Sequence, residues 1–286
     1  MAFGSDKTAA TVAAPDVQNV GLWNSGQHLR TSGERRLLWK LDLGILLAAS
    51  FGWFMRYVDQ ANLTSAYVSG MKEDLNITGN QYTYMNTSYL VAFSIMQLPS
   101  SIIGLKIRPS IWLFSCEIGW TIFTFAQAGA RTSTHMYLFR FMVGLFESAF
   151  SPVIIFLLGS WYTKRSSLSH RTSTWLLTGF LGEACSGFMQ AAIYGTLDGR
   201  NGLAGWRWMY IVCGIMSVPS AFLCLLLLPE YPSNTRTWYL TEEDRRLALQ
   251  RNALAAGPAS GFRSASGEAS SFILQLSIPL RSLMDP

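Results

Sequence analysis

Two ionisable residues, Arg140 and Glu147, stand inside RFMVGLFESAF, a segment that is otherwise mostly apolar. Seven residues make about two turns of an α-helix, so both side chains lie on one face, together with Gly144 and Ser151. A charged side chain at membrane depth costs about 2.5 to 3.5 kcal/mol on insertion scales and usually faces a bundle interior or a watery cavity. We therefore predict a polar seam directed away from lipid. Its two charged groups, about 10 Å apart along the axis, should meet partners from other helices, either to serve a function or only to pin those helices together.

A second group of polar residues stands near the end predicted for the first apolar run. Asp59 and Asn62 are about one helical turn apart, and Arg56 precedes Asp59 by the same spacing. These residues could belong to a binding or coupling site. Alternatively, Arg56 could extend its charged head to the membrane surface while the helix ends there in the ordinary way.

The second apolar run carries Asn86 and Gln97 at roughly helical spacing, with Pro99 close behind. A proline inside a helix frees a backbone carbonyl that must find another partner within the bundle. A kinked helix beside a cavity would place Gln97 among the site residues. A purely structural kink would not.

Glu183 interrupts a series of small residues in the fifth apolar run. Small residues at intervals of four let membrane helices approach closely. Glu183 could carry a proton at this face, or it could be a hydrogen-bonded tether to a neighbouring helix. The series consists of Gly179, Glu183, Gly187, Ala191 and Gly195.

The sequence lacks the usual signatures of enzymes and of metal sites. It contains no Ser-His-Asp order, no zinc-ligand spacing, no phosphate loop and no dinucleotide-binding glycine pattern, and its three histidines are isolated. The four cysteines all fall inside apolar runs, where they act as small apolar residues. We expect no catalytic residues, no metal and no cofactor.

The elements that must position these residues are long apolar segments. Of the 286 residues, 50% are hydrophobic and 14% are charged, well below the roughly 25% charge of soluble domains. A bilayer core of about 30 Å needs about 20 apolar residues per helix. We predict an all-α membrane protein with a bundle of six transmembrane helices. The apolar runs are 41–58, 82–103, 111–128, 136–161, 174–194 and 208–228.

Basic residues gather before the first run, in alternate connections and after the sixth run. By the positive-inside rule, both termini are cytoplasmic. The formal charge of +5 follows this topology, so we expect a lipid bilayer and not a nucleic acid as the partner. The domains predicted are a cytoplasmic tail at 1–36, a bundle at 37–230, and at 231–286 an amphipathic segment and linker that stops before a seventh helix. Thr241 and Asp244 form an approximate capping box in that segment.

Several segments together resemble one family, the anion:cation symporters of the major facilitator superfamily, in the fungal branch of allantoate permeases and pantothenate transporters. They are spread over residues 38–250, and no single one would be decisive. The segments are YVDQANLTSAYVSGMKEDL, QLPSSIIGLKIRPSIWL, RFMVGLFESAFSP, LGSWYTKRS, GWRWMYI and PEYPSNTRTWYLTEEDRRLA.

The resemblance implies a proton-coupled importer of a small organic anion, pantothenate or a similar carboxylate, at the plasma membrane. Arg140 would then meet the substrate carboxylate or form a gating ion pair, Glu147 or Asp59 would couple the proton, and Asn62 matches the polar end of the first helix. The family has about twelve helices around a cavity between two halves, and the six helices here match the amino-terminal half. Transport would require the carboxy-terminal half or self-association. The alternative is a non-transporting scaffold or sensor that associates with an intact transporter.

Overall fold

A computed structural model describes residues 32–162, 165–232 and 237–256, and the regular elements in these ranges are all helices. The predicted all-α class is therefore confirmed for this part of the chain. Most of the predicted tail and all of residues 257–286 of the predicted linker lie outside it. The helices are α1 (Ser32–Leu41), α2 (Leu47–Ala66), α3 (Lys72–Asp74), α4 (Gln81–Lys106), α5 (Pro109–Ala128), α6 (Ser133–Glu147), α7 (Phe150–Trp161), α8 (Arg165–Leu197), α9 (Gly205–Leu227) and α10 (Glu242–Ala256).

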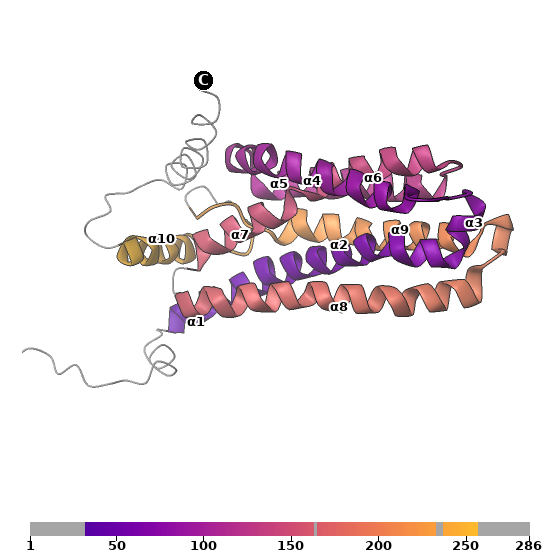
Figure 1. Cartoon of the computed structure of the whole chain (residues 1–286). Helices are drawn as coiled ribbons and strands as arrows, with labels where there is room; N and C mark the ends of the chain where they lie inside the picture. The colour runs from indigo at the N-terminus through magenta and orange to yellow at the C-terminus, as the bar shows by residue number, and fades with distance from the viewer. Residues whose placement is uncertain (1–31, 163–164, 233–236, 257–286) are drawn as a thin grey trace, which may run out of the picture.

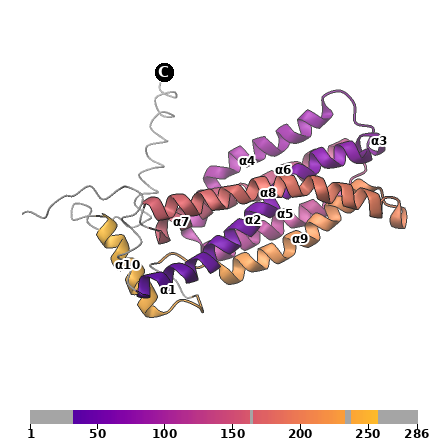
Figure 2. The same cartoon turned by 90° about the horizontal axis from the view of Figure 1, so that it is seen from below.

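The long helices form a bundle with two layers (Figure 1). One layer contains α4, α5 and α6, and the other contains α2, α8 and α9. The layers are joined where α5 packs against α9. Figure 2, seen from below, shows α4 and α9 on opposite sides of the bundle. The helix α2 packs against both α8 and α9, so its side chains reach the interface between the layers.

The first helix is longer than predicted. The helices α1, α2 and α3 follow one another through π-helical turns at Asp42–Leu46 and Tyr67–Met71, and together they make one span at Gly33–Asp74. The backbone leaves helical geometry only at Ser69 and Gly70, where Gly70 has a φ of +97°. The predicted end at residue 58 was therefore wrong. Asp59 and Asn62 lie in the middle of this helix and not at its end.

Five helices of the described part are long and apolar enough to cross a membrane, so the predicted count of six is not confirmed. The helix α5, which corresponds to the predicted run 111–128, does not reach this criterion. Polar residues such as Glu117, Thr124 and Gln127 lower its hydropathy, yet their side chains are fully buried in the bundle. The five spans are Gly33–Asp74, Gln81–Lys106, Ser133–Trp161, Leu168–Leu197 and Gly205–Leu227.

The fourth predicted run contains two helices, α6 and α7, with a break at Ser148 and Ala149. Pro152 explains the break, because it has no N–H to donate to the carbonyl of Ser148 one turn earlier. At the same break, the hydroxyl of Ser148 donates to the carbonyl of Leu145 at 2.8 Å. The break places Glu147 at the last residue of α6.

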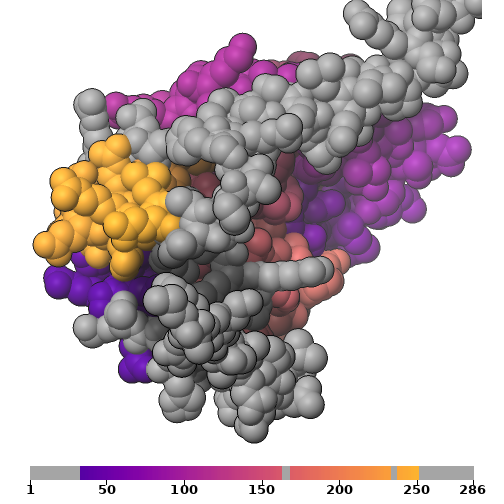
Figure 3. Space-filling view, turned by 90° about the vertical axis from the view of Figure 1, so that its left-hand side faces the viewer, coloured from indigo at the N-terminus to yellow at the C-terminus, as the bar shows by residue number. Residues whose placement is uncertain are grey.

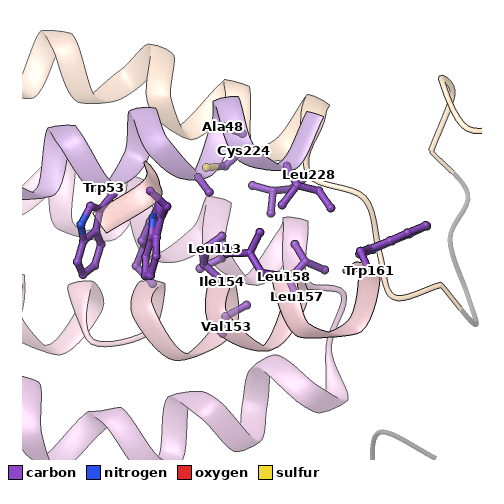
Figure 4. Packing of buried hydrophobic residues seen from close by; sticks show 14 of the residues in the cluster. Ala48, Trp53, Leu113, Val153, Ile154, Leu157, Leu158, Trp161, Cys224 and Leu228 are labelled. Atoms are coloured by element: carbon purple, nitrogen blue, oxygen red, sulfur yellow. The ribbon is translucent and has the colours of Figure 1, made fainter. Parts of the chain in front are cut away.

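Two apolar clusters stabilise the bundle, one on each side of a polar middle. The larger cluster surrounds α7, which is apolar over most of its surface, and includes Leu113, Ile154 and Leu228 (Figure 4). The other cluster, near α3, includes Leu63, Met136 and Trp206. In lipid there is no hydrophobic driving force between helices, so these clusters hold the helices that carry the polar groups through close van der Waals packing.

The helix α10 lies against α1 at one end of the bundle (Figure 3). The ammonium group of Lys40 donates a hydrogen bond to the carboxylate of Asp244. At the start of α10, the amide and hydroxyl of Thr241 donate to that carboxylate at 3.1 and 2.8 Å, and the amide of Asp244 donates back to the hydroxyl of Thr241 at 3.4 Å. The predicted capping box is confirmed.

Candidate functional site

A buried ion pair links the two layers of the bundle. Arg56 of α2 donates from Nε to Oε2 of Glu147 on α6 at 3.2 Å. The hydroxyl of Tyr89 on α4 donates to the same oxygen at 2.7 Å and accepts from Arg56 Nη2 at 3.3 Å. These contacts close a triangle among three helices. Breaking a buried pair leaves an uncompensated charge, which costs about 3 to 5 kcal/mol, so this triangle strongly favours one arrangement of the helices.

Aromatic rings enclose the guanidinium group of Arg56. Its central carbon lies 4.8 Å from the centroid of the Trp53 ring and 4.9 Å from that of Phe93, within the range of cation–π attraction. The residue is only 6% exposed. The interpretation that Arg56 extends to the membrane surface was therefore wrong. The helix continues past Arg56, and the charge is held inside by Glu147 and the rings.

A second pair of opposite charges lies next to the first. Asp59 accepts hydrogen bonds from the hydroxyl of Thr124 on α5 at 3.1 Å and from the amide of Asn62 at 3.4 Å. Arg140 on α6 donates to the hydroxyl of Tyr210 on α9 at 3.3 Å and interacts electrostatically with Asp59. We call Arg56, Asp59, Arg140 and Glu147 the charge cluster. It brings two guanidinium groups and two carboxyl groups together between the layers.

The predicted seam on the fourth helix is confirmed in its geometry. Arg140 and Glu147 are both buried, and each hydrogen-bonds to partners from other helices. Gly144, which lies between them, packs directly against α4, because a methyl group there would collide with the backbone oxygen of Tyr89. Two atoms of the cluster, Nε of Arg140 and Oε1 of Glu147, are buried without a hydrogen-bond partner among the described residues.

A polar groove opens beside the charge cluster, between α2, α4 and α8. Its volume is about 290 Å³, close to the lower end of the roughly 300 to 1,000 Å³ common for ligand pockets. Across it, the hydroxyl groups of Thr64 and Tyr82 are 2.9 Å apart. The groove is lined by Tyr57, Gln60, Ala61, Leu63, Thr64, Tyr82, Asn86 and Glu183.

Glu183 contributes to the groove from α8 and is exposed. It makes no hydrogen bond or ion pair with the residues that the structure describes, which does not support the tether interpretation. The predicted close-approach face is also wrong over most of its length. Gly179 packs against Trp53 and Tyr57, but a methyl group added at Gly187 would meet no atom of the described residues within 4 Å. The helix does approach the backbone of α2 closely at Gly182, where an added methyl carbon would lie 2.5 Å from the oxygen of Phe54.

Gln97 lies apart from both the cluster and the groove. Its side chain is exposed on α4, and its backbone carbonyl accepts from the hydroxyl of Ser101 at 2.6 Å. Gln97 follows Asn86 of the groove by eleven positions, which correspond to about 16 Å along a helix. The structure therefore brings together five of the six predicted residues around α2, namely Arg140, Glu147, Asp59, Asn62 and Glu183, and not Gln97.

Sequence reasoning missed several buried polar residues. Glu117 of α5 is fully buried and accepts from Ser220 at 3.4 Å and from the thiol of Cys224 at 3.2 Å. A charged residue inside an apolar run was the signal used for Arg140, and the same signal applies to Glu117. Tyr89 and Tyr210 gave no such signal, because tyrosine is ordinary in a membrane helix.

Residues 49–276 match the Major Facilitator Superfamily. The chain is 36% identical over 251 residues to the MFS transporter PfmaC of Pestalotiopsis fici, which covers 86% of this chain and 47% of that protein. The chain is 37% identical to the pantothenate transporter FEN2 of Saccharomyces cerevisiae, over 72% of this chain and 40% of that protein. It is 38% identical to the vitamin H transporter of the same yeast, over 78% of this chain and 38% of that protein. The chain therefore spans less than half the length of these relatives.

A solved structure supports the fold. A bacterial homologue of the human lysosomal transporter Spinster, in an inward-facing and unoccupied conformation, superimposes with a TM-score of 0.61 at 16% identity, covering 66% of this chain and 43% of that one. At this identity the likeness concerns the fold alone. Together with the apolar helices, these matches show that the chain is a multi-pass membrane protein that belongs to the major facilitator superfamily.

Proposed function

We propose that the chain forms the amino-terminal half of a proton-coupled importer for a small organic anion, pantothenate or a similar carboxylate. The observation that carries the proposal is the charge cluster, with two guanidinium groups and two carboxyl groups buried between helix layers next to a polar groove. Buried ionisable groups in membrane bundles mark ion and proton pathways. Relatives at 37% and 38% identity are named as transporters of pantothenate and of vitamin H.

In this proposal α5 also crosses the membrane, which brings the number of transmembrane helices in the bundle to six. It has 20 residues, about the number that a bilayer requires. Its polar residues Glu117, Thr124 and Gln127 are buried against its neighbours, so they do not face lipid. The protein lies in the plasma membrane, and the end of the bundle that holds α1 and α10 faces the cytoplasm.

Glu147 is the proposed proton site. Its Oε2 atom is held by Arg56 and Tyr89, whereas its Oε1 atom is free of partners among the described residues and can take up a proton. A proton on Glu147 removes the counter-charge of Arg56. Because these residues belong to different layers, protonation weakens the link between α2 and α6 and couples the proton to helix movement. Asp59 is the alternative carrier.

Arg140 acts as a gating residue and not as the first contact of the substrate. It is 2% exposed and is engaged with Tyr210 and Asp59. Asn62 orients Asp59 by donating a hydrogen bond to it. The substrate contacts the open groove, and the opposite wall comes from the carboxy-terminal half or a second copy, since transporter sites lie at the interface of repeats.

Glu147→Gln tests the proposal, because it keeps the shape of the side chain and removes the ionisable group. Uptake of labelled pantothenate by cells that express the full-length gene product should lose its dependence on an inward proton gradient. Exchange of labelled for unlabelled pantothenate should remain. Glu73→Gln, at an exposed residue of α3, is the matched control.

Proton-driven accumulation at the wild-type level in Glu147→Gln would exclude Glu147 as the coupling site. If the wild-type protein transports no organic anion but associates with an intact transporter, the scaffold alternative replaces the proposal.

A further inference from the structure

The groove has an unusual charge distribution for a protein that handles anions. Among the described residues that line it, Glu183 alone is ionisable at neutral pH, and no lysine or arginine is present. The other polar groups are the amides of Gln60 and Asn86 and the hydroxyls of three further residues. A carboxylate of the ligand is therefore not attracted to the α8 side of the groove.

We propose that Glu183 is a specificity-determining residue that accepts hydrogen bonds from the uncharged polar end of the transported acid. The inference rests on the proposed function and adds the orientation of the ligand. The hydroxyl or amide N–H groups of the acid point to α8, and its carboxylate points to the opposite side, near α2. The ligand class is a small monocarboxylic acid that also carries hydroxyl or N–H donors.

Electrostatics fix this orientation. Two carboxylates about 4 Å apart repel each other by about 4 kcal/mol at an effective dielectric constant of about 20. A hydrogen bond from a neutral donor to a charged acceptor instead stabilises by about 1.5 to 3 kcal/mol. On the α2 side a positive charge lies behind the groove wall, since Arg56 is 5.8 Å from the ring centroid of Tyr57, although Arg56 is itself buried and paired with Glu147.

The surroundings of Glu183 support a role toward a ligand. It belongs to the membrane span Leu168–Leu197, where a charged side chain is costly unless it meets a partner or water. It makes no hydrogen bond or ion pair with any described residue. One turn further along this face, a methyl group added at Gly187 would meet no atom of the described residues within 4 Å, so α8 is not packed against them at that point.

The test compares two acids of equal charge. One is pantothenate, and the other is pantothenate with both hydroxyl groups O-methylated, so that they no longer donate. Inhibition of labelled pantothenate uptake by each acid is measured for the wild type, Glu183→Ala and Glu183→Gln in the full-length protein. Binding of both acids to the purified full-length protein in nanodiscs is measured in parallel. Glu73→Ala is the control for loss of an exposed carboxylate.

We expect the wild type to prefer pantothenate by at least tenfold, and Glu183→Ala to reduce this ratio to about one, because tenfold corresponds to about 1.4 kcal/mol. Glu183→Gln should give an intermediate ratio, since its amide oxygen still accepts but carries no charge. An unchanged ratio in Glu183→Ala would overturn the inference, and so would an equal loss for both acids. Selective binding without proton-driven uptake would instead overturn the proposed function and leave the inference intact.

Discussion

The charge cluster and the groove lie on adjacent faces of α2, but charged groups are paired in the cluster and unpaired in the groove. In the cluster, Arg56 and Asp59 are buried and each is engaged with polar or charged partners from other helices. In the groove, Glu183 has no described partner and is exposed. The difference indicates that the closed region fixes the bundle and its coupling, whereas the open region is left to recognise a ligand.

Physical chemistry explains why the two regions must differ. A charge without water needs a counter-charge in good geometry, so the cluster permits few alternatives at any of its positions. A charge beside an open groove keeps access to water or to a ligand, so its desolvation costs less free energy. Such a charge can therefore favour one ligand over another. Mutations in the cluster should therefore change stability first, and mutations in the groove should change selectivity first.

The largest effect is expected for Arg56→Ala. It leaves the Glu147 carboxylate buried without its cation, which should destabilise the bundle by about 3 to 5 kcal/mol. Thermal unfolding of the detergent-purified protein measures this loss. The double variant Arg56→Leu with Glu147→Leu should recover much of the stability, because no unpaired charge remains, but it should not accumulate pantothenate.

Equal destabilisation of the single and the double variant would contradict this explanation. It would mean that packing of the Arg56 stem against Trp53 and Phe93, and not charge pairing, stabilises the site.

The sequence predicted most of the helices because hydropathy reports what faces lipid. It failed where a helix places its polar residues inward. The first helix was ended at residue 58 since Asp59, Gln60 and Asn62 follow, although Asp59 and Asn62 are fully buried. The helix α5 was predicted as the run 111–128, but it falls short of the apolar criterion for a membrane span because Glu117 and Gln127, which are buried in the bundle, lower its hydropathy.

The site was predictable where spacing on one helix determines it. The seven-residue interval between Arg140 and Glu147 predicted one buried face with partners elsewhere. The identity of those partners was not predictable, since Tyr89 and Tyr210 come from other helices and depend on tertiary packing. Gly179 and Gly187 both belong to the series of small residues at intervals of four, but their surroundings differ. The interval alone therefore could not distinguish the packed part of α8 from the open part.

Two glycines of α8 can sharpen this contrast. Gly182→Ala should destabilise by about 1 to 3 kcal/mol, because its methyl carbon would lie 2.5 Å from the backbone oxygen of Phe54. Gly187→Ala should be neutral or slightly stabilising, since nothing lies within 4 Å and alanine favours a helix by up to about 1 kcal/mol. The melting temperatures of the two variants in detergent provide the measurement. A larger loss for Gly187→Ala would show that the open face is packed in the folded protein.

The smallest effect is expected for an ion pair at the rim of the bundle. Burial of Asp244 opposes its ionisation, but hydrogen bonds from Lys40 and Thr241 outweigh burial and hold the pKa of Asp244 below its usual value of about 3.9. The folded state therefore favours the ionised form. The resulting stabilisation is fully present above the unfolded pKa and is lost as pH falls through the folded pKa.

Asp244→Asn should accordingly lower stability by only about 1 kcal/mol at pH 7, because pairs near the surface and helix caps contribute about that much. Melting curves of wild type and variant should converge as the pH is lowered below about 4, where the wild-type carboxyl also becomes neutral. Glu243→Gln, one residue earlier on the exposed side of α10, should show no such convergence. A loss at pH 7 as large as that of Arg56→Ala would remove the distinction between rim and interior, because two pairs of similar chemistry would then contribute equally despite their different burial.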